Sequence, residues 1–511
     1  MSTTTSHKLD RVLFGTTIAV IAAACLAILF AKDQAAPFIT NLHASVTSNM
    51  GVFYLAYAVG VLALLAYLAF GKYAQVVLGR TGDSIEFSNL SWIAMLFSTG
   101  VGAGLMYWCV IEWGYYVDTP PLGIEARSTE AFEWAASYGL FHWGITGWAL
   151  FCLPTLAIAY PYYVRREPHL RLSTACLPYL RGGVNGAGGR FVDFLFMLNL
   201  LGGTGTSLGL STPMIAASIA MVLGIEHTFG VEIAVVVLCI GLFGTSAYIG
   251  LRNGLKRLSD LNLYLAIGLL VFVLLAGPTL FILESGLNSM GIVLQNFIRM
   301  NTWTDPIADT GFVDSWTVFY WAWWIAYGPF VGIFVTRISR GRSIRQVIGG
   351  MLIFGSLGAA AFFIVFGNYA MHLELNDILS VTGTMKELGE ARAIAEVVAS
   401  LPSGKVVLFM FFVMSVVFLA TTYDSASYTL ASVATRNLDA GQDPVAWNRA
   451  FWALALVALP VTLMFIDGGL KVVLSATIVV SLPLVLVGVL MAMSLLKLLR
   501  EDAARRPTDT S

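Results

Sequence analysis

Long apolar runs recur along almost the whole chain, and each one ends at a short polar stretch. A helix needs about 20 apolar residues to cross a bilayer, and these runs are long enough to do so. The pattern predicts an all-α polytopic membrane protein with twelve transmembrane helices. The predicted spans lie near residues 12–31, 51–70, 91–117, 134–163, 191–223, 231–251, 261–284, 316–336, 347–371, 405–434, 449–466 and 470–497.

One polar stretch, residues 285–315, has a pattern of its own. Between Met290 and Met300 the apolar residues Ile292, Val293, Phe297 and others alternate with polar ones at helical spacing. Such an amphipathic segment is typical of a helix that lies in the membrane interface. We therefore predict an external loop that contains an interfacial helix.

The charged residues between the runs predict an orientation. Basic residues concentrate in the loops on one side of the membrane and acidic residues in those on the other. Because positive loops stay in the cytoplasm, the bias predicts a multi-pass protein of the cell inner membrane with cytoplasmic tails at 1–11 and 500–511. The basic loop residues include Lys8, Arg11, Lys72, Arg80, Arg165, Arg166, Arg252, Lys256, Arg337, Arg340, Arg436 and Lys497.

The composition narrows the class of protein further. Of the 511 residues 58% are apolar and 12% are charged, values that exclude an ordinary soluble domain and imply the lipid bilayer as partner. The net charge of −1 gives no reason to expect a nucleic acid partner. The five cysteines show no CxxC spacing, so we expect no disulfide, no bound metal other than a coupling ion, and no organic cofactor.

The eighth predicted span carries an unusual density of aromatic residues. Trp316, Tyr320, Trp323, Trp324 and Tyr327 follow at i, i+4, i+7, i+8 and i+11, which places them on one face of a helix. A surface facing lipid would use Leu and Val, and interfacial tryptophans would sit at the ends of the span. The stripe therefore predicts a cage of ring faces for an organic cation.

Two spans contain residues that interrupt helices. The third holds Gly100, Gly102 and Gly104, and the eighth holds Gly328-Pro329. Transporters built from inverted repeats bind substrate where one helix of each repeat is broken, and these two spans are five apart. Glycines also permit close packing of helices, which is the alternative. The paired spacing favours two broken helices, in repeats formed by spans 3–7 and 8–12.

The tenth span is polar in its middle. Thr421, Thr422 and Asp424 stand inside an apolar run, where such groups are costly unless they are paired or hold an ion. Hydroxyl oxygens together with carbonyls freed by a broken third span would suit Na⁺. The alternative is that each hydroxyl bonds the carbonyl one turn earlier. For Glu112 and His142, also inside spans, we predict structural hydrogen bonds, with a proton relay as the alternative for Glu112.

Several segments resemble one known family. The tryptophan segment 316–329, the basic stretch 337–345, and the motifs at 141–144, 205–209 and 119–121 resemble the betaine/choline/carnitine transporter family over nearly the whole chain. The resemblance implies the leucine-transporter-type fold of two inverted five-helix repeats, here 91–284 and 316–499, behind two peripheral helices in 12–70. It also implies a homotrimer and substrates that bear a quaternary ammonium or sulfonium group.

Position by position, the resemblance also implies a substrate site. The central aromatic box would consist of Trp143, Trp323, Trp324 and Tyr115, with Tyr327 where betaine carriers have another tryptophan. Trp316 resembles the outer-site tryptophan of carnitine carriers. The substrate carboxylate is left for backbone N–H groups at Gly102 and Gly104, where the helix dipole favours an anion. The residues named by this comparison are thus Trp143, Trp323, Trp324, Tyr327, Tyr115, Trp316, Gly102 and Gly104.

The same resemblance bears on the coupling ion. It implies a sodium site formed by Ser98, Val101, Phe418, Thr421 and Thr422. Thr204 matches one hydroxyl of a second sodium site, but Leu200 precedes it by one turn, so one site is expected. Sodium-independent antiporters carry an arginine that replaces the ion, and Lys256 stands at that place here.

Together these features predict a secondary active transporter that carries a zwitterionic quaternary ammonium compound of the betaine or carnitine type into the cell with Na⁺. The alternatives are a sodium-independent exchanger of the carnitine/γ-butyrobetaine type and a carrier for choline or dimethylsulfoniopropionate. We do not expect an enzyme, because His142 lacks the nucleophile or metal ligands that catalysis would need.

Overall fold

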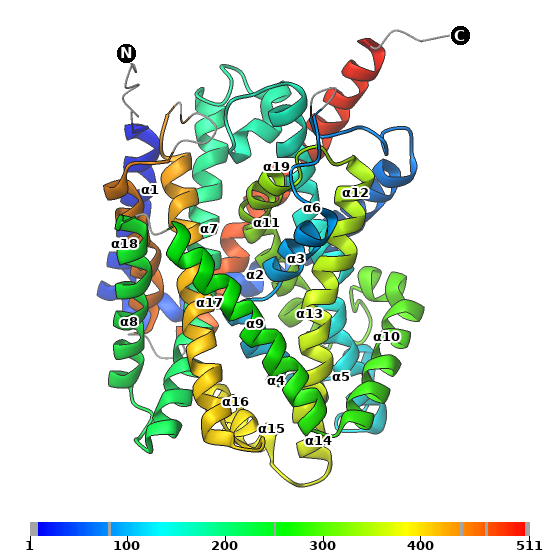
Figure 1. Cartoon of the computed structure of the whole chain (residues 1–511), viewed down its shortest axis with the longest axis vertical. Helices are drawn as coiled ribbons and strands as arrows, with labels where there is room; N and C mark the ends of the chain where they lie inside the picture. The colour runs from blue at the N-terminus through cyan, green and yellow to red at the C-terminus, as the bar shows by residue number, and fades with distance from the viewer. Residues whose placement is uncertain are drawn as a thin grey trace.

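The computed structural model describes residues 9–79, 83–249, 252–436, 438, 443–464 and 469–505. Within them the regular secondary structure is helical, and two isolated β-bridges join Leu9 to Thr435 and Val77 to Ser343. The helices pack as a bundle in which α1 begins and α19 ends at the same end of the molecule (Figure 1).

The helices follow the apolar runs closely. They are α1 (Arg11–Phe30), α2 (Lys32–Phe70), α3 (Asn89–Thr99), α4 (Ala103–Asp118), α5 (Thr129–His142), α6 (Ile145–Ala159), α7 (Ala187–Leu223), α8 (Phe229–Ile249), α9 (Arg252–Ala276), α10 (Thr279–Thr302), α11 (Val318–Ile338), α12 (Ile344–Gly350), α13 (Ser356–Phe362), α14 (Asn368–Leu375), α15 (Val381–Glu387), α16 (Glu390–Ala399), α17 (Gly404–Val433), α18 (Ala446–Met464) and α19 (Gly469–Arg505). Short 3₁₀ helices lie at Pro121–Gly123 and Leu172–Tyr179, and π-helical turns at Tyr160–Val164, Val313–Thr317, Met351–Gly355 and Phe363–Gly367.

The number of membrane spans agrees with the prediction. Among the described residues ten helices are long and apolar enough to cross a bilayer, and two bent pairs raise the number to as many as twelve. The bent pairs are α3 with α4 and the apolar part of α9 with α10. The chain is therefore an all-α polytopic membrane protein. Its division into two inverted repeats stays a prediction.

The seventh predicted span ends earlier than expected. It was predicted to reach residue 284, but α9 ends at Ala276 and the chain turns through 110° into α10. Gly277-Pro278 explains this end, because proline lacks the N–H that would continue the helix. The predicted interfacial segment 290–300 is helical but belongs to a longer helix that already starts at Thr279.

The second span is longer than predicted. It was expected to begin near residue 51, whereas α2 starts at Lys32 and directly follows α1. The residues from 32 to 50 contain several polar side chains, which is why hydropathy alone places the start of the span too late.

The predicted break of the eighth span at Gly328-Pro329 is wrong. Helix α11 is continuous through both residues. A Cβ atom on Gly328 would lie 3.2 Å from the Leu150 carbonyl oxygen, and one on Gly332 would lie 2.9 Å from the Thr155 nitrogen. These glycines therefore let α11 approach the backbone of α6, as small residues four apart often do in membranes.

A buried aspartate ties the start of α1 to two other helices. The Asp10 N–H donates to the Ala434 carbonyl (2.8 Å), and the fully buried carboxylate accepts from Arg190 Nε and Arg436 Nε, both at 3.0 Å. Burial raises the pKa of Asp10, but the hydrogen bonds from Arg436 and Arg190 outweigh it, and the pKa lies below its ordinary value. This set of contacts, the Asp10 clamp, connects α1 with α7 and with the residues that follow α17.

Candidate functional site

The predicted break in the third span is confirmed. Helix α3 ends at Thr99, α4 begins at Ala103, and their axes differ by 61°. Between them Gly102 is extended, with φ −156° and ψ 178°. A Cβ atom on Gly100 would lie 3.0 Å from the Trp148 ring, which explains why a glycine stands there. The first N–H groups of α4 have no partner within the helix, and such groups attract anions.

This break opens onto a cavity of about 1180 Å³. Aromatic side chains of α11, the end of α5, and hydroxyl groups of α17 line the same cavity. It also reaches Arg337, in the last turn of α11, and Arg340, which follows that helix. The predicted site residues that line it are Ser98, Val101, Gly102, Gly104, Trp143, Trp323, Trp324, Tyr327, Phe418, Thr421 and Thr422.

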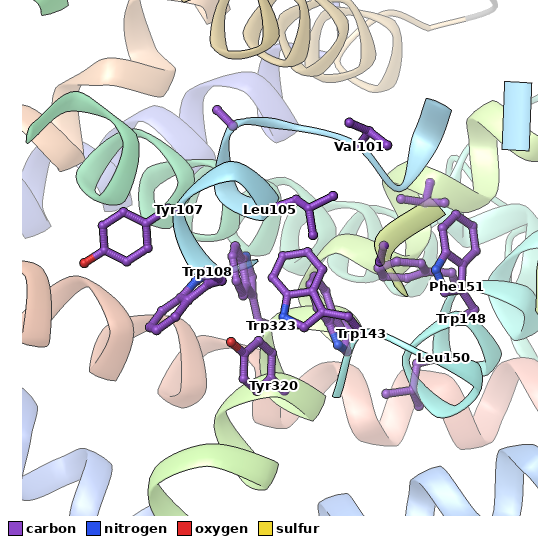
Figure 2. Close-up of a cluster of buried hydrophobic side chains, with 14 of the residues drawn as sticks. Val101, Leu105, Tyr107, Trp108, Trp143, Trp148, Leu150, Phe151, Tyr320 and Trp323 are labelled. Carbon is purple, nitrogen blue, oxygen red and sulfur yellow. The ribbon is translucent and has the colours of Figure 1, made fainter. Parts of the chain in front are cut away.

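Three tryptophans form one wall of the cavity. The rings of Trp323 and Trp324 are stacked, with centroids 4.9 Å apart and planes 12° from parallel. Trp143 meets both edge-on, at 6.0 Å from Trp323 and 4.8 Å from Trp324. Figure 2 shows Trp143 and Trp323 side by side, with Val101 and Leu105 of the broken span nearby. The ring faces of this cluster, the tryptophan cage, suit a methylated cation.

Polar contacts fix the edges of the cage. The Trp324 indole N–H donates to the His142 carbonyl (2.9 Å). The Tyr327 hydroxyl lies 3.2 Å from Ser207 Oγ of α7, and Ser207 also lines the cavity. Sequence reasoning missed Ser207, because a serine within a long apolar helix carries no signal that tells a lining residue from a packed one.

Tyr115, predicted as part of the box, lies elsewhere together with Trp316. The two rings are 5.1 Å apart, and Trp316 also contacts Trp108 at 5.9 Å. Neither Tyr115 nor Trp316 lines the cavity. The Tyr115 hydroxyl donates to Glu390 of α16 (2.5 Å). This second aromatic group, the outer cluster, is separated from the cage by Tyr320, which contacts Trp108 at 6.1 Å and Trp323 at 6.3 Å (Figure 2).

The two threonines of α17 face the cavity and also make the alternative contacts. Thr421 Oγ1 donates to the Val417 carbonyl and Thr422 Oγ1 to the Phe418 carbonyl, each at 2.9 Å. A hydroxyl that donates its proton keeps its oxygen lone pairs. Both threonines therefore bond one turn back and still present oxygen atoms to the cavity.

Thr204, the predicted ligand of a second sodium site, lies outside this arrangement. Thr204 donates to the Leu200 carbonyl (2.6 Å), and its own carbonyl accepts from Tyr423 (2.7 Å), so it belongs to the contact of α7 with α17. It does not line the cavity. Lys256 falls within the range of α9, but its side chain lies outside the described residues.

The hydrogen bonding predicted for Glu112 and His142 is confirmed, and it involves the cage. Glu112 is 1% exposed and accepts from Tyr116 (2.7 Å), from the Trp143 indole (3.1 Å) and from the Tyr320 hydroxyl. His142 Nδ1 lies 3.7 Å from Glu112 Oε1. The link to Trp143 was not predicted, because the donors come from three separate segments of the chain.

Comparison with known proteins places this geometry in a family. The profile of the betaine/carnitine/choline family of transporters matches residues 12–504. The chain is 36% identical over 446 residues to YeaV, an uncharacterized transporter of Escherichia coli, covering 87% of this chain and 92% of that protein. It is 35% identical over 441 residues to a carnitine transporter of Acinetobacter baumannii, covering 86% and 80%. The chain therefore belongs to the betaine/carnitine/choline transporter family: it is a membrane transporter for quaternary ammonium compounds, and not an enzyme.

Proposed function

We propose that this family member is a sodium-coupled symporter that carries a zwitterionic quaternary ammonium compound, of the betaine or carnitine type, into the cell. The observation that carries the proposal is the single cavity. It joins the tryptophan cage to the break between α3 and α4 and to the hydroxyl pair of α17. Ring faces suit a cation, the free N–H groups at the start of α4 suit a carboxylate, and the hydroxyl oxygens suit a small metal ion.

The cage and the break match the two ends of such a substrate. A trimethylammonium group donates no conventional N–H hydrogen bond, so ring faces are its natural partners, each contributing about 0.5–2 kcal/mol. The carboxylate would face the N-terminus of α4, near Gly102 and Gly104, where unpaired N–H groups and the helix dipole favour negative charge. Those two glycines line the cavity on the same side as Trp323, whose ring lies 3.4 Å from a Cβ built on Gly104.

Sodium would bind beside the substrate. The backbone at Ser98 and Val101, next to the break, and the oxygens of Phe418, Thr421 and Thr422 line the cavity together. Oxygen ligands of this kind suit a hard cation. The position of Thr204 away from the cavity supports one sodium site rather than two. Both the ion and its stoichiometry are proposals.

The arrangement of the aromatic groups supports transport by alternating access. The cavity runs from the cage toward Arg337 and Arg340, which the charge bias assigns to the cytoplasmic side. On the opposite side of the cage, the rings of the outer cluster pack against one another, and the Tyr115 hydroxyl donates to Glu390. We read this as an inward-facing state, with both termini in the cytoplasm and the protein in the inner membrane, and we expect a homotrimer.

Uptake into proteoliposomes tests the proposal. Purified protein is reconstituted, and uptake of radiolabelled L-carnitine and glycine betaine is measured with and without an inward sodium gradient. Accumulation only with the gradient is the expected result. Equal uptake without sodium, and only into vesicles preloaded with a related substrate, would replace symport by exchange, the activity for which Lys256 is the candidate built-in cation.

A further inference from the structure

The Glu112 carboxylate lies directly behind the tryptophan cage. Its Oε2 accepts from the indole N–H of Trp143 at 3.1 Å, and the ring of Trp143 meets both Trp323 and Trp324. The same oxygen accepts from Tyr320, whose ring centroid is 5.8 Å from that of Trp324. A single buried carboxylate thus holds one ring of the cage, Trp143, and the adjacent ring of Tyr320.

The groups that surround this carboxyl group suit its ionised form. Trp143 can only donate, and Tyr116 and Tyr320 each direct a hydroxyl toward an oxygen of Glu112. Three potential donors converge on two oxygens, an arrangement that a carboxylate satisfies fully.

The neighbouring histidine is compatible with a neutral state. Tyr116 already donates to Glu112, so His142 Nδ1, at 3.0 Å, must donate to the Tyr116 oxygen. His142 Nε2 lies 3.1 Å from Thr317 Oγ1 and can accept its proton. Within the described part of the chain, His142 is the one basic group that lies within ion-pairing distance of Glu112.

We propose that Glu112 is the counter-charge of the substrate site, a specificity-determining residue that selects cationic over uncharged head groups of the same shape. The proposal rests on the proposed function and deepens it. Glu112 does not touch the substrate, because Trp143 stands between them. It acts through space, and it enriches the electron density of the indole whose N–H it accepts.

The size of the effect follows from the distance. For a cation taken to lie roughly 8 Å from the carboxylate, at an effective dielectric constant of about 20, the attraction corresponds to about tenfold or more in the binding of the ammonium group. The carboxylate of the substrate is repelled by the same charge, so the effect is measured against a ligand that has the carboxylate but no cation. A purely packing role would make no such distinction between charged and uncharged ligands.

The test compares two ligands of one shape. L-Carnitine and 3-hydroxy-5,5-dimethylhexanoate differ only in that a carbon atom replaces the ammonium nitrogen. Dissociation constants for both are measured by titration calorimetry or competition, with sodium present, for the wild-type protein and Glu112→Gln. We expect Glu112→Gln to lower the preference for carnitine over the carbon analogue by about tenfold. The carboxylate is common to both ligands, so its repulsion by Glu112 cancels from the ratio of the two dissociation constants. Equal weakening of both ligands, or no change in their ratio, would overturn the proposal.

A control variant separates charge from hydrogen bonding. Tyr116→Phe removes one donor to Glu112 but keeps the carboxylate, so the ratio of the two dissociation constants should stay as in the wild type. A ratio that falls as far as in Glu112→Gln would show that the network, not the charge, sets the preference, and would also overturn the proposal.

Two further outcomes are distinguishable. If Glu112→Gln does not fold, the triple variant Glu112→Met, Tyr116→Phe, Tyr320→Phe removes the carboxylate together with its hydroxyl donors, and its ratio is measured instead. If the wild-type protein binds neither L-carnitine nor glycine betaine, the proposed substrate class fails, and this inference fails with it.

Discussion

Replacement of Trp323 by leucine is the sharpest test of the tryptophan cage. Trp323 is 3% exposed and stacks on Trp324 at the cavity wall, beside Gly104. Its indole N–H has no hydrogen-bond partner among the described residues, whereas that of Trp324 donates to His142. Trp323→Leu therefore removes one ring face from the site without breaking a hydrogen bond of the described structure.

The expected loss follows from the burial of the site. A cation–π contact contributes about 0.5–1 kcal/mol when exposed and about 2 kcal/mol when desolvated, and Trp323 is almost fully desolvated. We expect substrate binding to weaken by about 1–2 kcal/mol, which corresponds to roughly 5- to 30-fold in the dissociation constant. Trp323→Phe keeps a smaller ring face and should lie between Trp323→Leu and the wild type.

The assay is titration calorimetry with L-carnitine on the purified protein, and the chain offers a matched control. Trp321 belongs to the same helix, is fully buried, and also lacks an indole partner within the described structure, but it packs on Phe141 and does not line the cavity. Trp321→Leu should lower thermal stability and leave the dissociation constant unchanged. Equal effects of the two substitutions on binding, or none from Trp323→Leu, would refute the cage.

Three further predictions follow from contacts described above. Thr421→Ala combined with Thr422→Ala should raise the sodium concentration for half-maximal uptake by about tenfold, equivalent to about 1.4 kcal/mol of ion binding; uptake indifferent to this change would mean that sodium binds elsewhere. Gly203→Ala would place a methyl carbon 2.8 Å from the Tyr327 ring, so calorimetry should show severalfold weaker substrate binding, and unchanged affinity would contradict the position of that ring. Asp10→Asn should lower the melting temperature at pH 7. Because the pKa of Asp10 is depressed in the folded protein, its stabilisation is fully present above about pH 4 and shrinks as the pH falls from there through the folded-state pKa, so the difference in melting temperature should narrow over that range. A difference between them that does not narrow as the pH is lowered from about 4 would argue against the ion-paired clamp.

The sequence predicted the spans well because the thickness of the bilayer dictates their length. The break after Thr99 was predictable for a related reason. Three glycines within five residues weaken a helix, and the ring of Trp148 leaves no room for a side chain at Gly100. Here the local chemistry of the segment is sufficient to determine its conformation.

The Gly328-Pro329 pair shows where such reasoning stops. Its residue types suggest a break as strongly as those of the third span, but α6 lies against this face of α11, and the glycines serve that contact. Tyr115 and Trp143 were likewise assigned to one box, but Trp143 lines the cavity whereas Tyr115 packs against Trp316. Two partners of Glu112, Trp143 and Tyr320, could not be predicted either, because they come from segments distant in sequence; the third, Tyr116, follows one turn later in the same helix.

The close contact of α6 with α11 has a consequence for energy coupling. At Gly328 and Gly332 the two helices touch backbone to backbone, which leaves them little freedom to slide past each other. The rings on α11 and Trp143 at the entrance to α6 should then travel as one body through the transport cycle. In that case the ring faces would contact the substrate in the same way whether the site opens to the outside or to the cytoplasm. In the proposed symport, the sodium gradient would then act only through the opposite wall, where the α3–α4 break meets α17.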